Sequence, residues 1–127
     1  MKLRVRHNSV RFRLGQSEVE ALRNTGSCRE RILFPGGAQL EYALVASGNG
    51  EIAASFSNGV VTVSIPKDEL NSWHATDRIG LRASLDVAGE EKLLVLVEKD
   101  FRCLDERVDE DESDAFANPA GVPQSCG

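Results

Sequence analysis

Four arginines alternate with apolar residues near the start of the chain. Arg4 and Arg6 precede His7-Asn8-Ser9, which predicts a tight turn, and Arg11 and Arg13 follow it. Alternate residues of a strand point to one face, so a hairpin here would gather the four guanidinium groups on one surface. Like charges that face each other across a sheet destabilise it, so we expect an anionic group beside them. Since guanidinium groups bind phosphate and carboxylate with paired hydrogen bonds, this surface is a candidate anion site.

A cluster of carboxylates near the other end of the chain could provide that group. Residues 1–34 hold eight basic and three acidic residues, whereas residues 101–127 hold two and seven. The seven carboxylates, here called the acidic run, are Asp105, Glu106, Asp109, Glu110, Asp111, Glu112 and Asp114. The acidic run and an external anion, such as phosphate, are the two candidate occupants of the arginine surface. We favour the acidic run, because the whole chain has a net charge of −5 and no aromatic side chain alternates onto the arginine face. Both facts also disfavour nucleic acid as a partner.

The acidic run partly matches a calcium-binding loop. Asp109, Asp111 and Ser113 have the spacing of the first three oxygen ligands of such a loop. The match then fails, because Asp114 stands where glycine is needed and Ala120 stands where a glutamate is needed. A looser divalent-metal site stays open as the alternative, but we predict no metal and no cofactor.

The remaining chemistry-bearing residues form no recognisable catalytic set. Neither His7 nor His74 has a histidine or cysteine at zinc-ligand spacing. The three cysteines, Cys28, Cys103 and Cys126, are odd in number and far apart, which argues against a disulfide framework. The sequence contains neither a glycine-rich phosphate loop nor a Gly-x-Ser-x-Gly motif. We therefore expect a protein that is not an enzyme, and assign no catalytic residue.

Strands must position most of these residues. The Asn58-Gly59 pair lies between alternating runs, and predicts a two-residue hairpin in which Phe56 and Val61 face each other on the buried side. The turn at Gly48-Asn49-Gly50 predicts that the same ladder continues backwards into the preceding strand. The continuous apolar run from Leu93 to Val97 indicates a strand covered on both faces. In the arginine hairpin, the inward side chains should be Leu3, Val5, Val10, Phe12 and Leu14.

Two segments break the strand pattern and predict short helices. In the first, the spacing of Ser17 and Glu20 fits a capping box, and Gly26 is a plausible stop. The second begins after Pro66 and carries Leu70 and Trp73 on one face.

The two halves of the chain show the same order of elements at an offset of 51 residues. Val10, Phe12 and Leu14 then coincide with Val61, Val63 and Ile65, and the predicted helices also coincide. We predict an α+β fold, mainly antiparallel β, with two short helices. A duplicated ββαββ unit would pack as two halves about a pseudo-twofold axis, into a small barrel or a sandwich.

Length and composition indicate one domain. The chain has 127 residues, of which 41% are hydrophobic and 28% charged, as in ordinary globular proteins. We expect residues 1–119 to form a compact domain and residues 120–127 to form a flexible tail. The sequence has no apolar run long enough to cross a membrane and does not begin like a signal peptide, so we expect no membrane association and a cytoplasmic location.

Two stretches resemble a known family. They are Lys2 to Leu14 with Gln16-Ser17-Glu18-Val19, and Val97 to Leu104 with Glu110 to Pro119. Both are similar to a family of small uncharacterised bacterial proteins, which implies no activity. The resemblance does imply that the segment up to Pro119 belongs to the domain, with Phe116 as an anchor after the acidic residues.

These observations leave two functions open. The favoured one is a non-catalytic binding or adaptor module for a protein or small anionic ligand, acting through the arginine hairpin or the groove between the halves. The alternative is a small enzyme, with or without a divalent metal, that uses carboxylates of the acidic run. These carboxylates are Asp105, Asp109, Asp111, Glu112 and Asp114. Oligomeric state stays open.

Overall fold

The computed structural model describes residues 1–48, 50–101 and 114–117. Within them the chain forms eight strands and two helices in the order ββαββ, repeated once. The first half contains β1 (Lys2–Arg6), β2 (Ser9–Leu14), α1 (Gln16–Thr25), β3 (Ser27–Leu33) and β4 (Gln39–Ser47). The second half contains β5 (Ala53–Ser57), β6 (Val60–Pro66), α2 (Lys67–Ala75), β7 (Gly80–Ala88) and β8 (Glu91–Lys99).

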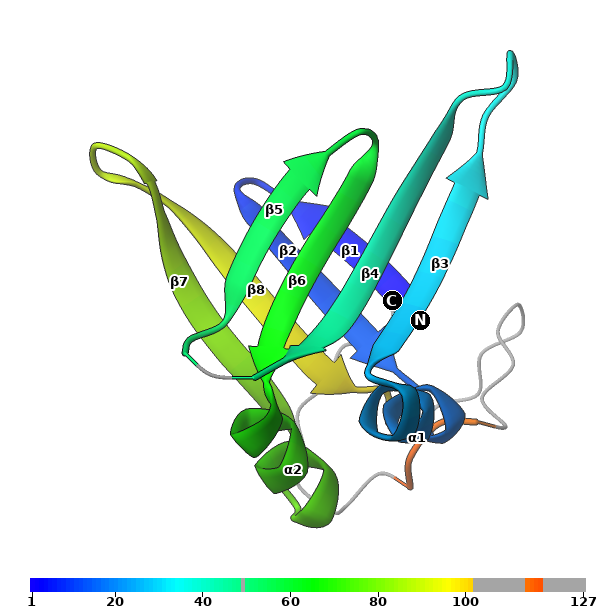
Figure 1. Cartoon of the computed structure of the whole chain (residues 1–127), viewed down its shortest axis with the longest axis vertical. Helices are drawn as coiled ribbons and strands as arrows, with labels where there is room; N and C mark the ends of the chain where they lie inside the picture. Colours follow the sequence, from blue (N-terminus) through cyan, green and yellow to red (C-terminus); the bar gives the residue numbers. More distant parts are fainter. Residues whose placement is uncertain (49, 102–113, 118–127) are drawn as a thin grey trace.

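The strands form two four-stranded sheets, and each sheet takes strands from both halves (Figure 1). Sheet A has the order β1-β2-β8-β7, and sheet B has the order β3-β4-β6-β5. Each hairpin is antiparallel, whereas the two halves meet through parallel pairs, β2 with β8 and β4 with β6. The predicted α+β fold with mainly antiparallel sheets is confirmed. The barrel alternative is wrong, because no hydrogen-bonded pairing of the described strands joins the edges of one sheet to the other.

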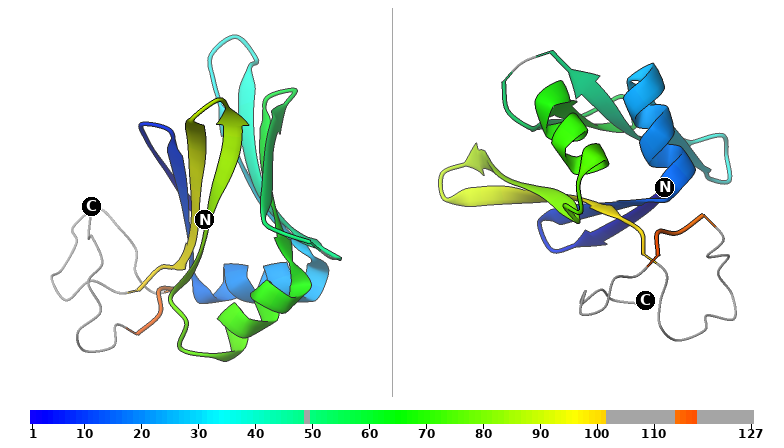
Figure 2. Two further views of the ribbon diagram at one scale, coloured as in Figure 1. Left: turned by 90° about the vertical axis from the view of Figure 1, so that its left-hand side faces the viewer. Right: turned by 90° about the horizontal axis from the view of Figure 1, so that it is seen from below.

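The core lies between the inner faces of the two sheets and is covered by both helices. The helices lie across the same end of the sheets (Figure 2). Leu22 of α1 and Trp73 of α2 are fully buried there. The buried cluster consists of Phe12, Leu14, Val19, Leu22, Tyr42, Leu44, Val63, Ile65, Leu70, Trp73, Leu81, Val95 and Val97.

Local signals in the sequence predict several turns correctly. Asn58 and Gly59 both have positive φ, as a two-residue hairpin turn requires, and Phe56 lies opposite Val61. Gly26 ends α1 in the left-handed conformation, and its amide donates to the carbonyl of Leu22.

The start of α1 differs from the prediction. The helix begins at Gln16, and the side chain of Glu18 accepts a hydrogen bond from the amide of Gly15 at 2.9 Å. The hydroxyl of Ser17 instead donates to the carboxylate of Asp114 at 2.8 Å. A carboxylate from the other end of the chain thus replaces the local cap that the sequence suggests.

The predicted pairing across the turn at residues 48–50 is also wrong. β6 lies between β4 and β5 and pairs with both. β6 carries the fully buried side chains of Val63 and Ile65, so it takes an interior position of sheet B. The shorter strand β5 is left at the edge.

Two side chains predicted to point into the core are exposed. Val5 is 67% exposed and Phe56 is 70% exposed. Both lie close to the turns of their hairpins, at the end of the sheets that the helices do not cover (Figure 2). The alternation is correct for both strands, but the core does not extend as far as these residues.

Candidate functional site

The outer face of sheet A gathers the basic residues of the first hairpin. In the pairing of β1 with β2, Arg4 lies opposite Arg11 and Lys2 lies opposite Arg13. Arg6 follows on the same side of β1, because alternate residues of a strand share a face. We call Lys2, Arg4, Arg6, Arg11 and Arg13 the basic face. On this face, the arginine alternation in the sequence becomes a continuous charged surface.

A shallow concavity of about 320 Å³ lies on this face. Its lining residues are Arg4, Arg6, Ser9, Arg11, Leu94 and Leu96. Leu94 and Leu96 come from β8, which pairs with β2 so that Leu96 lies beside Arg11. The sequence predicts a strand covered on both faces here, whereas both leucines are only half-buried. The concavity therefore has cationic side chains on its β1 and β2 side and apolar side chains on its β8 side.

Two carboxylates, one in β8 and one directly after it, neutralise part of the basic face. The Nε of Arg11 lies 3.0 Å from a carboxylate oxygen of Glu98. The amine of Lys2 lies 3.0 Å from the carboxylate of Asp100. Among residues 1–48, 50–101 and 114–117, no carboxylate lies within ion-pair distance of Arg4 or Arg6. Both guanidinium groups are exposed within this part of the chain.

Arg13 has a different environment from the other three arginines. It points to the outer side of β2, as predicted, but it is only 6% exposed. Burial lowers the pKa of its guanidinium, and the neighbouring Glu98 carboxylate opposes that shift. An arginine remains charged under such conditions. Arg13 is therefore a buried part of the basic face, not one of its contact groups.

The chain returns to the body of the protein at residues 114–117. The amide of Phe116 donates to the carbonyl of Asp100 at 2.7 Å, and its ring lies 5.8 Å from the ring of Phe101. The amine of Lys99 lies 5.5 Å from the centre of the Phe116 ring. We call residues 114–117 the closing segment. The remaining predicted site residues, Asp105, Asp109, Asp111 and Glu112, lie outside the described residues.

Lys99 is a buried cation that the sequence does not single out. Its amine donates to the carbonyl of Thr76 at 2.8 Å, next to the end of α2. Burial lowers the pKa of this amine. Only its position two residues after the apolar run of β8 could have drawn attention to it.

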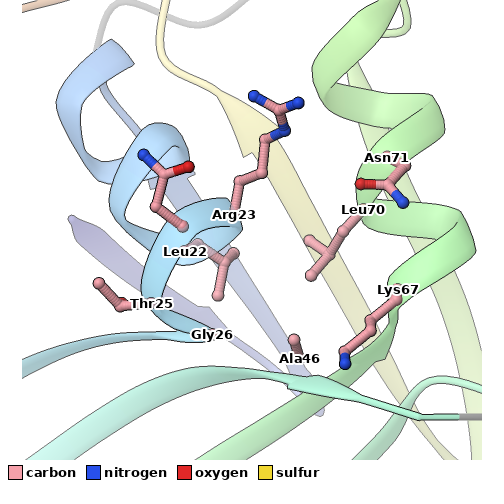
Figure 3. Close-up of a pocket in the computed structure, with 9 residues that line it drawn as sticks. Leu22, Arg23, Thr25, Gly26, Ala46, Lys67, Leu70 and Asn71 are labelled. Atoms are coloured by element: carbon pink, nitrogen blue, oxygen red, sulfur yellow. The ribbon is translucent and has the colours of Figure 1, made fainter.

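A second concavity, of about 350 Å³, lies between the end of α1 and the start of α2 (Figure 3). Leu22 and Leu70 lie beneath it and are almost fully buried, and Arg23 and Lys67 extend from opposite helices. Because α1 belongs to the first half and α2 to the second, this groove lies between the halves.

The described residues that could take part in catalysis are not brought together. His74 of α2 lies 2.5 Å from the carboxylate of Glu20 in α1, and this hydrogen bond lowers the pKa of Glu20. His7 lies in the turn of the first hairpin. In the part of the chain that the structure describes, no group of three His, Cys, Asp or Glu side chains is placed to hold a metal.

Comparison with known proteins places the chain in a family. A protein-family model matches residues 1–120, which include both the basic face and the acidic run. The chain belongs to DUF7009, a family of unknown function. Membership of DUF7009 confirms the resemblance seen at both ends of the sequence. No curated protein and no solved structure matches this DUF7009 chain. Of its described helices, none is long and apolar enough to cross a membrane.

Proposed function

We propose that the protein is a non-catalytic binding module that holds an anionic partner on its basic face. The observation that carries the proposal is the concavity that Arg4, Arg6 and Arg11 of β1 and β2 line together with the neighbouring Leu94 and Leu96 of β8. Guanidinium groups bind carboxylates and phosphates through paired hydrogen bonds, and the leucines offer apolar contact to the partner.

An acidic polypeptide fits this surface better than a nucleic acid does. Proteins that bind single-stranded nucleic acid stack bases on aromatic side chains, and no aromatic residue lines the concavity. The net charge of −5 also opposes the approach of a phosphate backbone. In a peptide with carboxylates beside aliphatic side chains, the carboxylates would match the arginines and the aliphatic side chains would match Leu94 and Leu96. We propose that such a partner is met in the cytoplasm.

We propose the acidic run as the occupant of the basic face within the same chain. Residues 102–113 connect Phe101 to Asp114, and both of these residues lie at the end of sheet A that is near the helices. Half of this segment is six residues, which span at most about 20 Å when extended. The segment is therefore long enough to reach Arg4 and return. The segment also contains Leu104 and Val108 between its carboxylates. Charge, apolar content and length thus all support docking of the acidic run on the basic face.

The described residues offer no observation in favour of an enzyme. Asp114 is the one carboxylate of the acidic run within them, and it caps α1. It is therefore occupied in a structural role.

We also infer that the two ββαββ halves are related by a pseudo-twofold axis. β1 and β5 span residues 2–6 and 53–57, an offset of 51, and α1 and α2 begin at residues 16 and 67, the same offset. The hydroxyls of Thr25 and Thr76 donate to the carbonyls of Ala21 and Ser72 in the same way. The reciprocal parallel pairs, β2 with β8 and β6 with β4, also fit this relation.

The binding proposal is tested by calorimetric titration of a peptide that alternates glutamate with leucine. We expect the double variant R4Q/R6Q to bind about tenfold more weakly than the wild type, since each exposed pair contributes up to about 1 kcal/mol. The matched control is R29Q/R31Q, which removes two exposed arginines from β3, an edge strand of sheet B. An equal loss of affinity in both variants would mean that only net charge matters, and would overturn the proposal.

A further inference from the structure

Of the four edge strands among the described residues, β5 is the one without a charged side chain. It consists of Ala53-Ala54-Ser55-Phe56-Ser57. The other edge strands, β1, β3 and β7, each carry two or three charged side chains. Charges on an edge strand oppose its pairing with a strand of another chain, because that strand would have to accept them as neighbours. β5 therefore lacks a protection that the other three edges have.

The matching strand of the first half shows this difference most directly. β1 and β5 have the same place in the two ββαββ halves, at an offset of 51 residues. The three basic residues of β1 are replaced at the matching positions by Ala53, Ser55 and Ser57. The position of Val5 stays apolar, because Phe56 matches it, and both side chains are largely exposed. One of two otherwise similar edges has thus been left neutral.

The outer edge of β5 presents backbone donors and acceptors. In a hairpin with a two-residue turn, the residues beside the turn exchange backbone hydrogen bonds, and every second pair after them does the same. Ser57 pairs with Val60 beside the turn, so alternate residues of β5 bond to β6 from there. The amides and carbonyls of Ala54 and Phe56 therefore point away from β6, where sheet B has no further described strand (Figure 1). Two donors and two acceptors are available there to a strand that lies alongside.

A concavity of about 340 Å³ lies between the start of β5 and the edge strand β7 of the other sheet. Its apolar lining includes Ile52, directly before β5, and Ala83 and Leu85 of β7. These three side chains are only half-buried, so they offer apolar surface beside the open edge. The charged residues of the lining are two glutamates and two arginines, and one of each, Glu69 and Arg78, form an ion pair at 2.9 Å. With no net charge, this surface favours a neutral ligand over an ionic one.

We propose that β5 is a docking edge for an extended, uncharged segment of a partner protein, which adds a fifth strand to sheet B. The backbone of the segment bonds to Ala54 and Phe56, as in other proteins that bind a strand at a sheet edge. Alternate apolar side chains of the segment lie on the same face as the ring of Phe56, which is 70% exposed, and towards Leu85. The site is on sheet B and does not depend on the basic face of sheet A.

The shape of the molecule favours a single segment over a second copy of the chain. The β7–β8 hairpin of sheet A projects past β5 on this side (Figure 1, Figure 2). A second copy that paired its own β5 with this edge would bring its own β7–β8 hairpin into the same space. An extended segment needs only the width of one strand, about 4.8 Å from β5.

The test is hydrogen exchange of the ¹⁵N-labelled full chain with and without the blocked peptide Lys-Val-Thr-Val-Thr-Val-Glu, whose net charge is zero. The amides of Ala54 and Phe56 should exchange fast in the free chain, and about tenfold more slowly at a peptide concentration of about ten times Kd. The amides of Ala53, Ser55 and Ser57 already bond to β6 and should change less. The control peptide Lys-Val-Val-Thr-Thr-Val-Glu has the same composition without the alternation, and should give no saturable protection.

Variants separate the backbone of β5 from its side chains. Phe56→Ala removes the ring, whereas Phe56→Pro also removes an outward amide and keeps the bonds to β6, so the proline variant should bind the peptide more weakly. Ala54→Pro removes the other outward amide and repeats the test if Phe56→Pro does not fold. Val5→Pro makes the matched change on β1 and should leave the affinity unchanged. Equal affinities for Phe56→Ala and the two proline variants would overturn the proposal, because the backbone would then play no part.

The remaining outcomes identify other occupants. Protection of Ala54 and Phe56 that increases with the concentration of the chain alone would mean that a second copy occupies the edge, and would overturn the assignment of a partner segment. Peptide binding should be unchanged in R4Q/R6Q and insensitive to salt, because it involves no exposed ion pair. Binding that is lost only in R4Q/R6Q would move the peptide to the basic face, which would overturn the β5 site and leave the proposed function standing.

Discussion

The carboxylate of Asp114 accepts a hydrogen bond of 2.8 Å from the hydroxyl of Ser17, which lies 97 positions earlier in the chain. The same carboxylate accepts from the amide of Ser17 at 3.2 Å, and the carbonyl of Asp114 accepts from the amide of Gln16 at 2.9 Å. The first turn of α1 is therefore capped by the closing segment. This contact ties the end of the acidic run to the helix that joins the two sheets.

Removal of this cap should destabilise the fold. Asp114→Ala leaves the amide and the hydroxyl of Ser17 without their partner and removes a negative charge from the helix start, so we expect a loss of about 1–2 kcal/mol. Chemical denaturation measures the free energy of unfolding. Ser17→Ala removes only the hydroxyl bond, and should lower stability less. A double variant whose loss equals the sum of the two single losses would contradict the direct contact.

Phe116 should act as the anchor of the closing segment. Phe116→Ala removes the contact with the ring of Phe101 and with the amine of Lys99, so we expect a loss of about 1–3 kcal/mol. Phe116→Leu keeps an apolar side chain, so its loss of unfolding free energy should be about half of the loss in Phe116→Ala. Thermal unfolding of the three proteins gives the comparison. Equal midpoints for the wild type and Phe116→Ala would show that the segment is not anchored by this ring.

The thiol of Cys28 should react slowly at ordinary pH. Burial raises its pKa above the usual 9.0, and the nearby Glu18 carboxylate adds to this shift. A raised pKa leaves less thiolate at any given pH, so the alkylation rate should be low at pH 8 and should still increase above pH 9. Mass spectrometry of the peptide that contains Cys28 follows the reaction, with the urea-unfolded chain as control. A rate that levels off below pH 9 in the folded protein would be inconsistent with this environment.

Neutralising the acidic run should expose the basic face. In a variant with Asn or Gln at the six acidic positions from 105 to 112, the closing segment stays intact. If these carboxylates dock on Arg4 and Arg6, the variant should bind a glutamate–leucine peptide about tenfold more tightly, because the intrachain competitor is lost. It should also have a lower thermal midpoint. Unchanged affinity and midpoint would show that the acidic run does not occupy this face.

The features predicted correctly from the sequence depend on residues that are close in the chain. Asn58-Gly59 determines its own turn, and the alternation of Arg4 and Arg6 determines which side chains share a face. The features predicted wrongly depend on distant residues. The start of α1 is set by Asp114, and the place of β5 in sheet B is set by the parallel pairing of β4 with β6.

In the candidate site too, features set by residues close in the chain were predicted correctly, and features set by distant residues were not. Sequence alternation was enough to group the arginines, but not to show that Arg13 is buried. Leu94 and Leu96 looked like core residues, because an apolar run does not reveal which of its faces lies against charged neighbours. The groove between Leu22 and Leu70 could not be located from the sequence, since it depends on how the two helices pack.

The most direct test of the central claim is a map of amide chemical shifts as the glutamate–leucine peptide is added to the ¹⁵N-labelled full chain. If the basic face is the binding surface, the shifts should saturate and concentrate on Arg4, Arg6, Arg11, Leu94 and Leu96. They should also decrease as salt is added, because the contacts are between exposed charges. Shifts that spread evenly over both sheets, or that map to sheet B, would contradict the account.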